Sequence, residues 1–352
     1  MASCASEPPS AGGGPAQSPA QARAVIEESL PKVVSDRTGW INDIYAGFSV
    51  QKLEPTRKNV CAVVAEIEQE SNFQVDPLVP GLGSIARREI DTRAQRTGVP
   101  LLIVHGALDL RSANGRTYSE RIDAARTEKD LSDIYEDFIG AIPLGRTLFA
   151  GLNPIRTRGP MQVNIAYANE YAAIRPYPYP VKVSIADEVF TRHGSLYFGI
   201  AHLLAYEPPY DAYIFRFADF NAGQYASRNA AFQNALGRAS GLPLVPDGAL
   251  LLDKGEANSP GETELALRTV AARLNLDESE IHSALERGKT RDFEQSNVYV
   301  RVFALAEHVA KHPLPRAVIP TITLHGPKIS RRLTTSWYAH RVDGRFEQCL
   351  HR

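Results

Sequence analysis

Three glutamates lie within five residues in the sequence EIEQESNFQVDP, at positions 66–77. A helix turns by about 100° per residue, so TRKNVCAVVAEIEQES directs one apolar stripe toward a core. That stripe consists of Val60, Val63, Val64, Ile67 and Ser71. Glu68 and Glu70 fall at its two edges, and Glu66 lies further round toward water. A carboxyl group at such an edge can be partly desolvated, which raises its pKa as a general acid requires, and can still reach a substrate. Taken alone, this segment favours the simpler interpretation that all three glutamates solvate one face of the helix.

Four short sequences follow one another along the chain in the order of a known family. They are Glu70-Ser71-Asn72-Phe73, Gly159-Pro160-Met161-Gln162-Val163, Asp219-Phe220-Asn221-Ala222-Gly223 and Gln295-Ser296-Asn297-Val298-Tyr299-Val300. Together they resemble the catalytic-glutamate, Gly-Leu-Met-Gln, Ala-Tyr-Asn-Ala-Gly and Glu-Thr-x-x-Tyr-Val motifs of the soluble lytic transglycosylases, which have the lysozyme-like fold. Each motif is weak alone, and their shared order is what favours this family.

The resemblance implies an enzyme that cleaves the MurNAc–GlcNAc bond of peptidoglycan with a single carboxyl group. Glycosidases usually need two carboxylates. In a lytic transglycosylase one glutamate, here Glu70, protonates the glycosidic oxygen and then deprotonates the C6 hydroxyl of the muramoyl sugar. That hydroxyl closes a 1,6-anhydro ring, so no water is activated. The chemistry is acid–base only and implies no cofactor and no metal.

The resemblance also implies the residues that would bind the glycan strand around Glu70. Ser71 would bond the substrate or brace Glu70, unless its hydroxyl is buried and bonds back to its own helix. Met161 and Gln162 would line the cleft, although they also suit a core position and a helix start. Phe220 stands where the family usually has tyrosine, so one hydroxyl contact to sugar is lost.

Two more residues complete the predicted site, and a third, Asp219, leaves the mechanism open. Asn221 would position the substrate, and Tyr299 would direct its hydroxyl at Glu70 unless it lies in an aromatic core. Asp219 is either exposed to solvent or directed into the cleft as a second carboxylate. In the second case the enzyme would be a hydrolase of the goose-lysozyme type.

Composition excludes several other classes of protein. The 352 residues carry a formal net charge of −1, and no long basic run suggests nucleic acid. No window approaches the roughly 18 apolar residues of a membrane-spanning helix. The three cysteines and nine histidines form no zinc-ligand pattern. Cys61 and Cys349 could pair or remain separate thiols, because spacing alone does not fix geometry.

The first residues favour a tethered protein of the bacterial envelope. Ala2-Ser3-Cys4 resembles the end of a lipoprotein signal, and a linker rich in Pro, Gly, Ala and Ser follows. The alternative is a disordered cytosolic tail. The chain as a whole also resembles, over most of residues 36–350, a proteobacterial lipoprotein family described as a domain of unknown function. We therefore expect a periplasmic location, with Cys4 as the lipid anchor in the outer membrane and peptidoglycan strands as the partner.

The predicted fold is mainly α: a lysozyme-like helical domain with a helical insertion and an extended C-terminal segment. The expected boundaries are 1–22 for the linker, 23–312 for the helical domain, 78–153 for the insertion within it, and 313–352 for a C-terminal wrap that includes a short hairpin. LLIVHGALDL fits a helix or a buried strand. The insertion and the altered motifs also allow a second class of function, a non-catalytic peptidoglycan-binding or scaffold lipoprotein.

Overall fold

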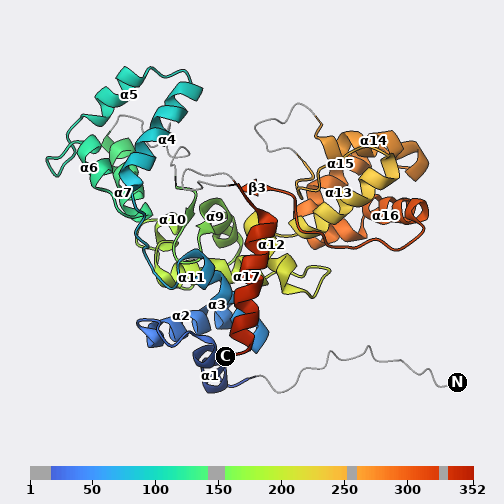
Figure 1. The fold of residues 1–352 in the computed structure, drawn as a ribbon, viewed down its shortest axis with the longest axis horizontal. Helices are drawn as coiled ribbons and strands as arrows, with labels where there is room; N and C mark the ends of the chain where they lie inside the picture. The colour runs from blue at the N-terminus through green and yellow to red at the C-terminus, as the bar shows by residue number, and fades with distance from the viewer. Residues whose placement is uncertain (1–16, 142–154, 252–259, 325–331) are drawn as a thin grey trace.

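The computed structural model describes residues 17–141, 155–251, 260–324 and 332–352, and Cys4 lies outside them. Its three hydrophobic cores correspond to a central body, an insertion and a second helical unit (Figure 1). The fold is mainly helical, as predicted. No helix of the described ranges is long and apolar enough to cross a membrane. The same residues contain no group of three His, Cys, Asp or Glu side chains that could hold a metal ion.

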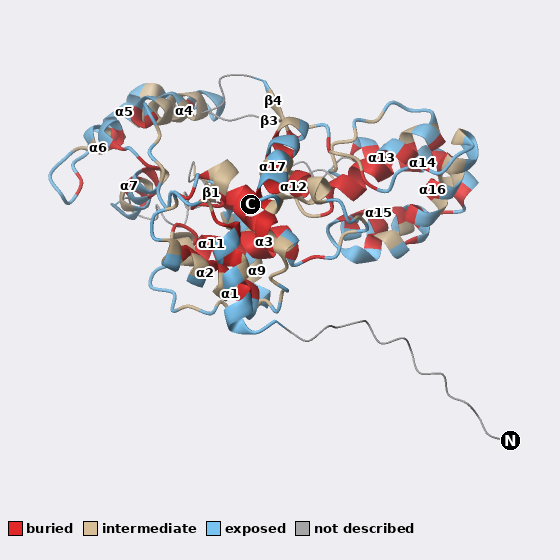
Figure 2. Ribbon diagram, turned by 60° about the horizontal axis from the view of Figure 1, so that its bottom comes forward, coloured by how far each residue is buried: buried red, intermediate tan, exposed pale blue. Residues whose placement is uncertain are grey.

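The central body collects helices from both ends and the middle of the chain. Its helices are α1 (Pro19–Ser29), α2 (Arg37–Val50), α3 (Arg57–Glu70), α9 (Ile165–Ile174), α10 (Ile185–Glu188), α11 (Arg192–Leu204), α12 (Tyr213–Ala222) and α17 (Thr335–Leu350). Two antiparallel strands of two residues each, β1 (Thr157–Arg158) and β2 (Val163–Asn164), form a hairpin that precedes α9. Buried residues gather on α3 and α11 at its centre (Figure 2).

Helix α3 is the buried axis of this body. Thr56 caps it by accepting the amide of Asn59 at 3.2 Å, and every residue from Val60 to Ile67 is buried. Helices α1, α11 and α17 all pack against it. A helix that neighbours enclose on more than one side is buried beyond its apolar stripe. The prediction that Glu66 faces water is therefore wrong, because Glu66 is 0% exposed.

The C-terminal region is only partly the extended wrap that the sequence predicted. Its hairpin exists, formed by β3 (Thr323–Leu324) and β4 (Leu333–Thr334). From Thr335 onward the chain is helical, with Thr334 as the N-cap of α17. The buried side chains of α17 recur every three or four residues, which is the period of a helix. They are Thr335, Tyr338, Ala339, Val342, Phe346 and Cys349. The helix packs against both α3 and α12.

A second helical unit follows the central body within the residues 23–312 that were predicted as one domain, and it has its own hydrophobic core. Its elements are α13 (Ala226–Ser240), α14 (Glu262–Leu274), α15 (Glu278–Glu286), two 3-10 turns, η2 (Arg287–Lys289) and η3 (Arg291–Gln295), and α16 (Asn297–Ala310). Phe232, Phe293 and Phe303 lie at the centre of its core. This unit occupies the right side of Figure 1.

Within the described residues the predicted insertion is helical. It consists of α4 (Leu82–Arg96), α5 (Leu101–Leu108), α6 (Tyr118–Ala124) and α7 (Glu128–Ala141), with a small core around Tyr118 and Ile122. LLIVHGALDL forms the helix α5 rather than a strand. The buried Arg158 links this subdomain to the central body, because it donates to Ser132 Oγ at 2.6 Å and to the carbonyl oxygen of Ala186 at 3.0 Å.

Candidate functional site

Glu66 and Glu70 meet at one tyrosine hydroxyl. They are four residues apart on α3, so both carboxyl groups lie on the same face of its last turns. The hydroxyl of Tyr338, from α17, lies 2.6 Å from Glu66 Oε2 and 2.7 Å from Glu70 Oε1. Glu66 and Tyr338 are buried, whereas Glu70 is partly exposed. The site thus joins two helices that are 268 residues apart in sequence.

Burial dominates the electrostatics of this site. It raises the pKa of the Glu66 carboxyl well above its usual value, and the neighbouring Glu70 adds to that rise while the Tyr338 hydroxyl opposes it. The pKa of Tyr338 is also raised well above its usual value, by burial and then by the two carboxylates. Tyr338 therefore keeps its proton and acts as a hydrogen-bond donor at neutral pH.

The backbone turns sharply directly after Glu70. Asn72 and Phe73 both adopt positive φ, at 49° and 62°, which is uncommon for residues other than glycine. The turn ends α3 and returns Phe73 to the core, where its ring meets Trp40 edge-on with 5.0 Å between ring centroids. The carboxyl group of Glu70 is thereby placed at the boundary between a packed core and the surface.

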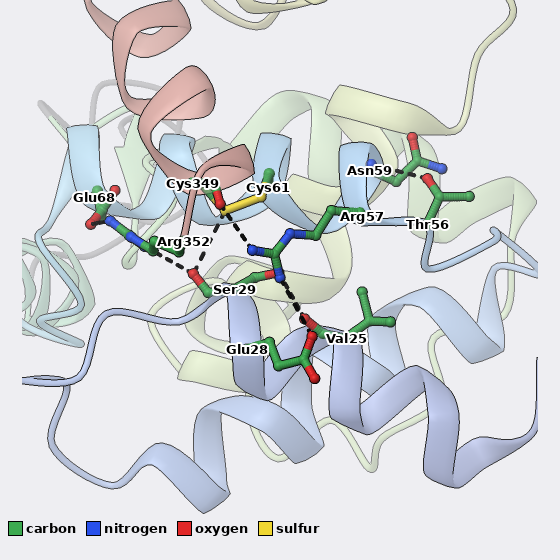
Figure 3. Close-up of a disulfide and its surroundings, with 10 residues drawn as sticks. All are labelled: Val25, Glu28, Ser29, Thr56, Arg57, Asn59, Cys61, Glu68, Cys349 and Arg352. Carbon is green, nitrogen blue, oxygen red and sulfur yellow. Dashed lines mark hydrogen bonds and ion pairs between the residues drawn. A yellow bond between two sulfur atoms is a disulfide. The ribbon is translucent and has the colours of Figure 1, made fainter.

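A disulfide fixes α17 against α3. Cys61 and Cys349 are bonded, which resolves the alternative that the sequence left open (Figure 3). Arg57 donates to the carbonyl oxygen of Cys349 at 3.1 Å, and Arg352 donates to Glu68 Oε1 at 2.7 Å. The bond joins the start of α3 to the end of α17, while the end of α3 meets Tyr338 near the start of α17. The two helices therefore run antiparallel, and the disulfide sets their register.

Asn221 also contacts the start of α17. Thr335, in the first turn of α17, donates its hydroxyl to Asn221 Oδ1 at 2.8 Å, one helical turn before Tyr338. Asn221 is exposed at the end of α12, where Gly223 ends the helix with a φ of 110° that favours glycine. The neighbouring Phe220 is partly buried, with 5.1 Å between its ring centroid and that of His202. The structure thus connects Glu70 and Asn221 through one turn of α17.

Gln162 contacts the insertion. Its side chain accepts from Thr157 Oγ1 at 2.8 Å and donates to Glu128 Oε2, in the first turn of α7, at 3.1 Å. Gly159 makes this turn possible, because its φ is 72° and a Cβ there would overlap the carbonyl oxygen of Val189. Met161 is 0% exposed and packs on Gly199, so it fills the core, and the prediction that it lines a cleft is wrong.

Two further predicted site residues have structural roles instead. Ser71 is buried, and its hydroxyl donates to the carbonyl oxygen of Ile67 at 3.2 Å, the alternative that the sequence left open. Tyr299 belongs to the core of the second helical unit and stacks on Phe232 with 5.9 Å between ring centroids. The prediction that Tyr299 directs its hydroxyl at Glu70 is therefore wrong, because Tyr338 occupies that position.

Sequence reasoning missed Glu66 and Tyr338. A signal for the tyrosine was present, because Tyr338, Val342 and Phe346 follow one another at intervals of four residues. The preceding β-branched and Gly/Pro-rich sequence obscured this helical pattern. No comparable signal existed for Glu66, since its burial depends on the packing of α17.

Asp219 is a buried hydrogen-bond acceptor for several groups. Both predictions for it, exposure to solvent or a place in the cleft as a second carboxylate, are therefore wrong. It is 0% exposed and accepts the hydroxyls of Tyr206, at 2.9 Å, and Tyr210. It also accepts the backbone amides of Tyr225, at 3.1 Å, and Ser227, at 2.6 Å. These bonds join α12 to the start of α13. A carboxylate occupied by four donors in the interior is not placed to act on a substrate.

We expect Asp219→Ala to destabilise the protein by about 2–3 kcal/mol, because the substitution leaves buried donors without an acceptor. The free energy of unfolding from urea titration measures this loss. Asp211→Ala is the matched control, since Asp211 is exposed a few residues earlier and should change stability by less than about 0.5 kcal/mol. Equal effects of the two substitutions would contradict the structural role of Asp219 as a buried acceptor.

The fold and the site define a mainly helical protein in which a buried central helix ends at a glutamate pair bridged by one tyrosine. The chain belongs to the family described as "Protein of unknown function (DUF1615)", whose model matches residues 33–352. It is 50% identical over 327 residues to the protein named "Uncharacterized protein YaiW" of Escherichia coli (strain K12). That alignment covers 93% of this chain and 89% of the relative. No solved structure matches the chain. The predicted resemblance to a family of unknown function is thus confirmed.

Proposed function

We propose that the protein is a peptidoglycan lytic transglycosylase of the lysozyme-like superfamily, with Glu70 as its only catalytic carboxyl group. The observation that supports this best is the position of Glu70. It ends the buried helix α3, is partly exposed, and accepts a hydrogen bond from Tyr338 at 2.7 Å. A carboxyl group that is held by a donor and still reaches the surface suits a residue that must both give and take a proton.

In the proposed reaction Glu70 first gives its proton to the glycosidic oxygen as the bond from that oxygen to C1 of the muramoyl sugar breaks. Glu70 then takes the proton of the C6 hydroxyl while that oxygen bonds to C1, which regenerates the acid and closes the 1,6-anhydro ring. Between the two steps Glu70 is ionised, and the Tyr338 hydroxyl stabilises that charge. Gln162 and Asn221 are the proposed sugar contacts, together with Phe220, which precedes Asn221 on α12. Cys4 remains the proposed lipid anchor, which would hold the enzyme at the outer membrane in the periplasm.

Mass analysis of sacculi digested with the protein tests this proposal. Muropeptides with 1,6-anhydro ends are expected. Products heavier by one water would instead indicate a goose-type hydrolase, which would need a second carboxylate. The best sequence candidate for that carboxylate, Asp219, is buried and fully engaged, which favours the anhydro product.

The insertion favours one alternative, a non-catalytic peptidoglycan-binding or scaffold lipoprotein. Helix α5 presents Leu102 and Ile103 at 85% and 62% exposure, so part of its surface is available to a partner. Sedimentation of the protein with sacculi, without any release of product, would support this alternative over the enzyme.

A further inference from the structure

The Tyr338 hydroxyl carries one proton but lies between two carboxyl oxygens. The distances are 2.6 Å to Glu66 Oε2 and 2.7 Å to Glu70 Oε1, both within hydrogen-bonding range. A hydroxyl can donate to only one of them. If both glutamates were ionised, the other contact would bring a hydroxyl lone pair against a carboxylate lone pair. Both contacts are favourable only if one of the carboxyl groups carries a proton and donates it to the Tyr338 oxygen.

The structure distinguishes the two carboxyl groups. Glu66 is 0% exposed, whereas Glu70 is partly exposed at the surface. Within the described residues Glu66 Oε1 is buried and has no hydrogen-bond partner, which is costly for an ionised carboxylate and tolerable for a neutral one. Besides burial, the Tyr338 hydroxyl of α17 acts on the Glu66 carboxyl through a hydrogen bond, and Glu70 of α3 itself acts through its negative charge, so neither group supplies a cation.

We propose that Glu66 is a positioning residue that stays protonated at neutral pH and donates to the Tyr338 oxygen, so that the single hydroxyl proton of Tyr338 is directed to Glu70. Glu66 touches no substrate in this arrangement. It fixes which way the Tyr338 hydroxyl points, and the hydroxyl in turn stabilises ionised Glu70. The catalytic consequence rests on the proposed function, whereas the protonation of Glu66 and the direction of the hydrogen bonds do not.

Infrared difference spectroscopy tests the protonation without any enzyme assay. The wild-type minus Glu66→Gln difference spectrum at pH 7 is expected to show the carbonyl stretch of a protonated carboxylic acid, the band lost with Glu66. Glu70→Gln should retain this band, because the proton on Glu66 does not depend on whether Glu70 is also protonated. A wild-type minus Glu66→Gln spectrum without this band, or a Glu70→Gln variant that lacks it, would overturn the proposal.

The pH dependence of stability gives a second test. A carboxyl group whose pKa is higher in the folded protein stabilises the fold below its unfolded pKa, and that stabilisation is lost as the pH rises through the folded pKa. The ratio of the wild-type unfolding constant to that of Glu66→Gln should therefore increase with pH. The increase should begin above about pH 4.3, the ordinary pKa of glutamate, and reach up to about tenfold per pH unit. Parallel pH profiles for the two proteins would show that Glu66 is ionised in the fold.

Activity variants then separate positioning from mere packing. Tyr338→Phe and Glu66→Leu both remove the hydrogen-bond donor that is directed at Glu70, so ionised Glu70 loses stabilisation. The high-pH limb of the kcat–pH profile should therefore move up by about one pH unit. Glu66→Gln should keep the limb at its wild-type position, because an amide N–H can replace the carboxyl proton as the donor to Tyr338. A limb that moves equally in Glu66→Gln and Glu66→Leu would refute the positioning role. If the wild type digests no sacculi, the proposed function fails, and the spectroscopic and stability tests still decide the state of Glu66.

Discussion

Glu70→Gln is expected to reduce the release of 1,6-anhydro muropeptides from sacculi by at least about 10³-fold. One carboxyl group performs both proton transfers in the proposed reaction, and an amide can perform neither. Gln can still accept the hydrogen bond that Tyr338 donates at 2.7 Å, so the fold and the position of α17 should be preserved. The rate of product release, measured by mass spectrometry against a wild-type digest, gives the size of the loss.

Glu68→Gln is the matched control for this experiment. Glu68 is on the same helix, at the other edge of the predicted apolar stripe, and its carboxylate pairs with Arg352 at 2.7 Å. We expect its rate of product release to stay within about twofold of the wild type, because its partner Arg352 follows the C-terminal end of α17, whereas Tyr338 lies near the start of that helix. Product release that survives in Glu70→Gln, with an unfolding midpoint like that of the wild type, would remove Glu70 from the catalytic role.

Local sequence pattern was sufficient for the elements that depend on near neighbours. The helix that ends at Glu70 could be predicted because an apolar period follows a Thr56 cap. The helical insertion and the short β3–β4 hairpin could be predicted for the same kind of reason. In each case the hydrogen bonds or side-chain contacts that define the element join residues close together in the chain.

The same pattern was insufficient for Glu66, because periodicity assigns only one buried face to a helix. Helix α17 buries a second face of α3, and it comes from the far end of the chain. The side chain that meets Glu66 is 272 residues away. A helix wheel drawn for an isolated segment cannot contain that contact, so the most buried of the three glutamates was predicted to be the most hydrated.

The resemblance to family motifs gave a wrong prediction where it assigned a contact between two side chains rather than a helix or strand. It predicted correctly that a carboxyl group ends α3 beside a tyrosine hydroxyl, but it selected Tyr299, which lies in the core of the second helical unit. The tyrosine beside Glu70 is Tyr338 from α17. A tyrosine can reach a given carboxyl group from any helix that packs beside it, so the identity of the donor depends on tertiary packing that a motif does not encode.

Replacing both Cys61 and Cys349 with serine is expected to lower the free energy of unfolding by about 5 kcal/mol. The disulfide closes a loop with a sequence separation of 288, and the loss of stability on removing a crosslink increases with loop length in the chain-entropy account. In that account the disulfide acts mainly on the unfolded state, because the crosslink restricts the conformations of the unfolded chain. Urea titrations of the oxidised wild type and the double variant measure the difference.

Dithiothreitol provides the control within the same experiment. It should destabilise the wild type by a similar amount and leave the double variant unchanged. A double variant as stable as the oxidised wild type would show that packing alone holds α17 in register. Activity should fall along with stability, because the register set at Cys349 also places Tyr338, about three helical turns away, against Glu66 and Glu70. The loss of product release in reductant should therefore be partial at temperatures where the fold survives, and it should match that of the double variant.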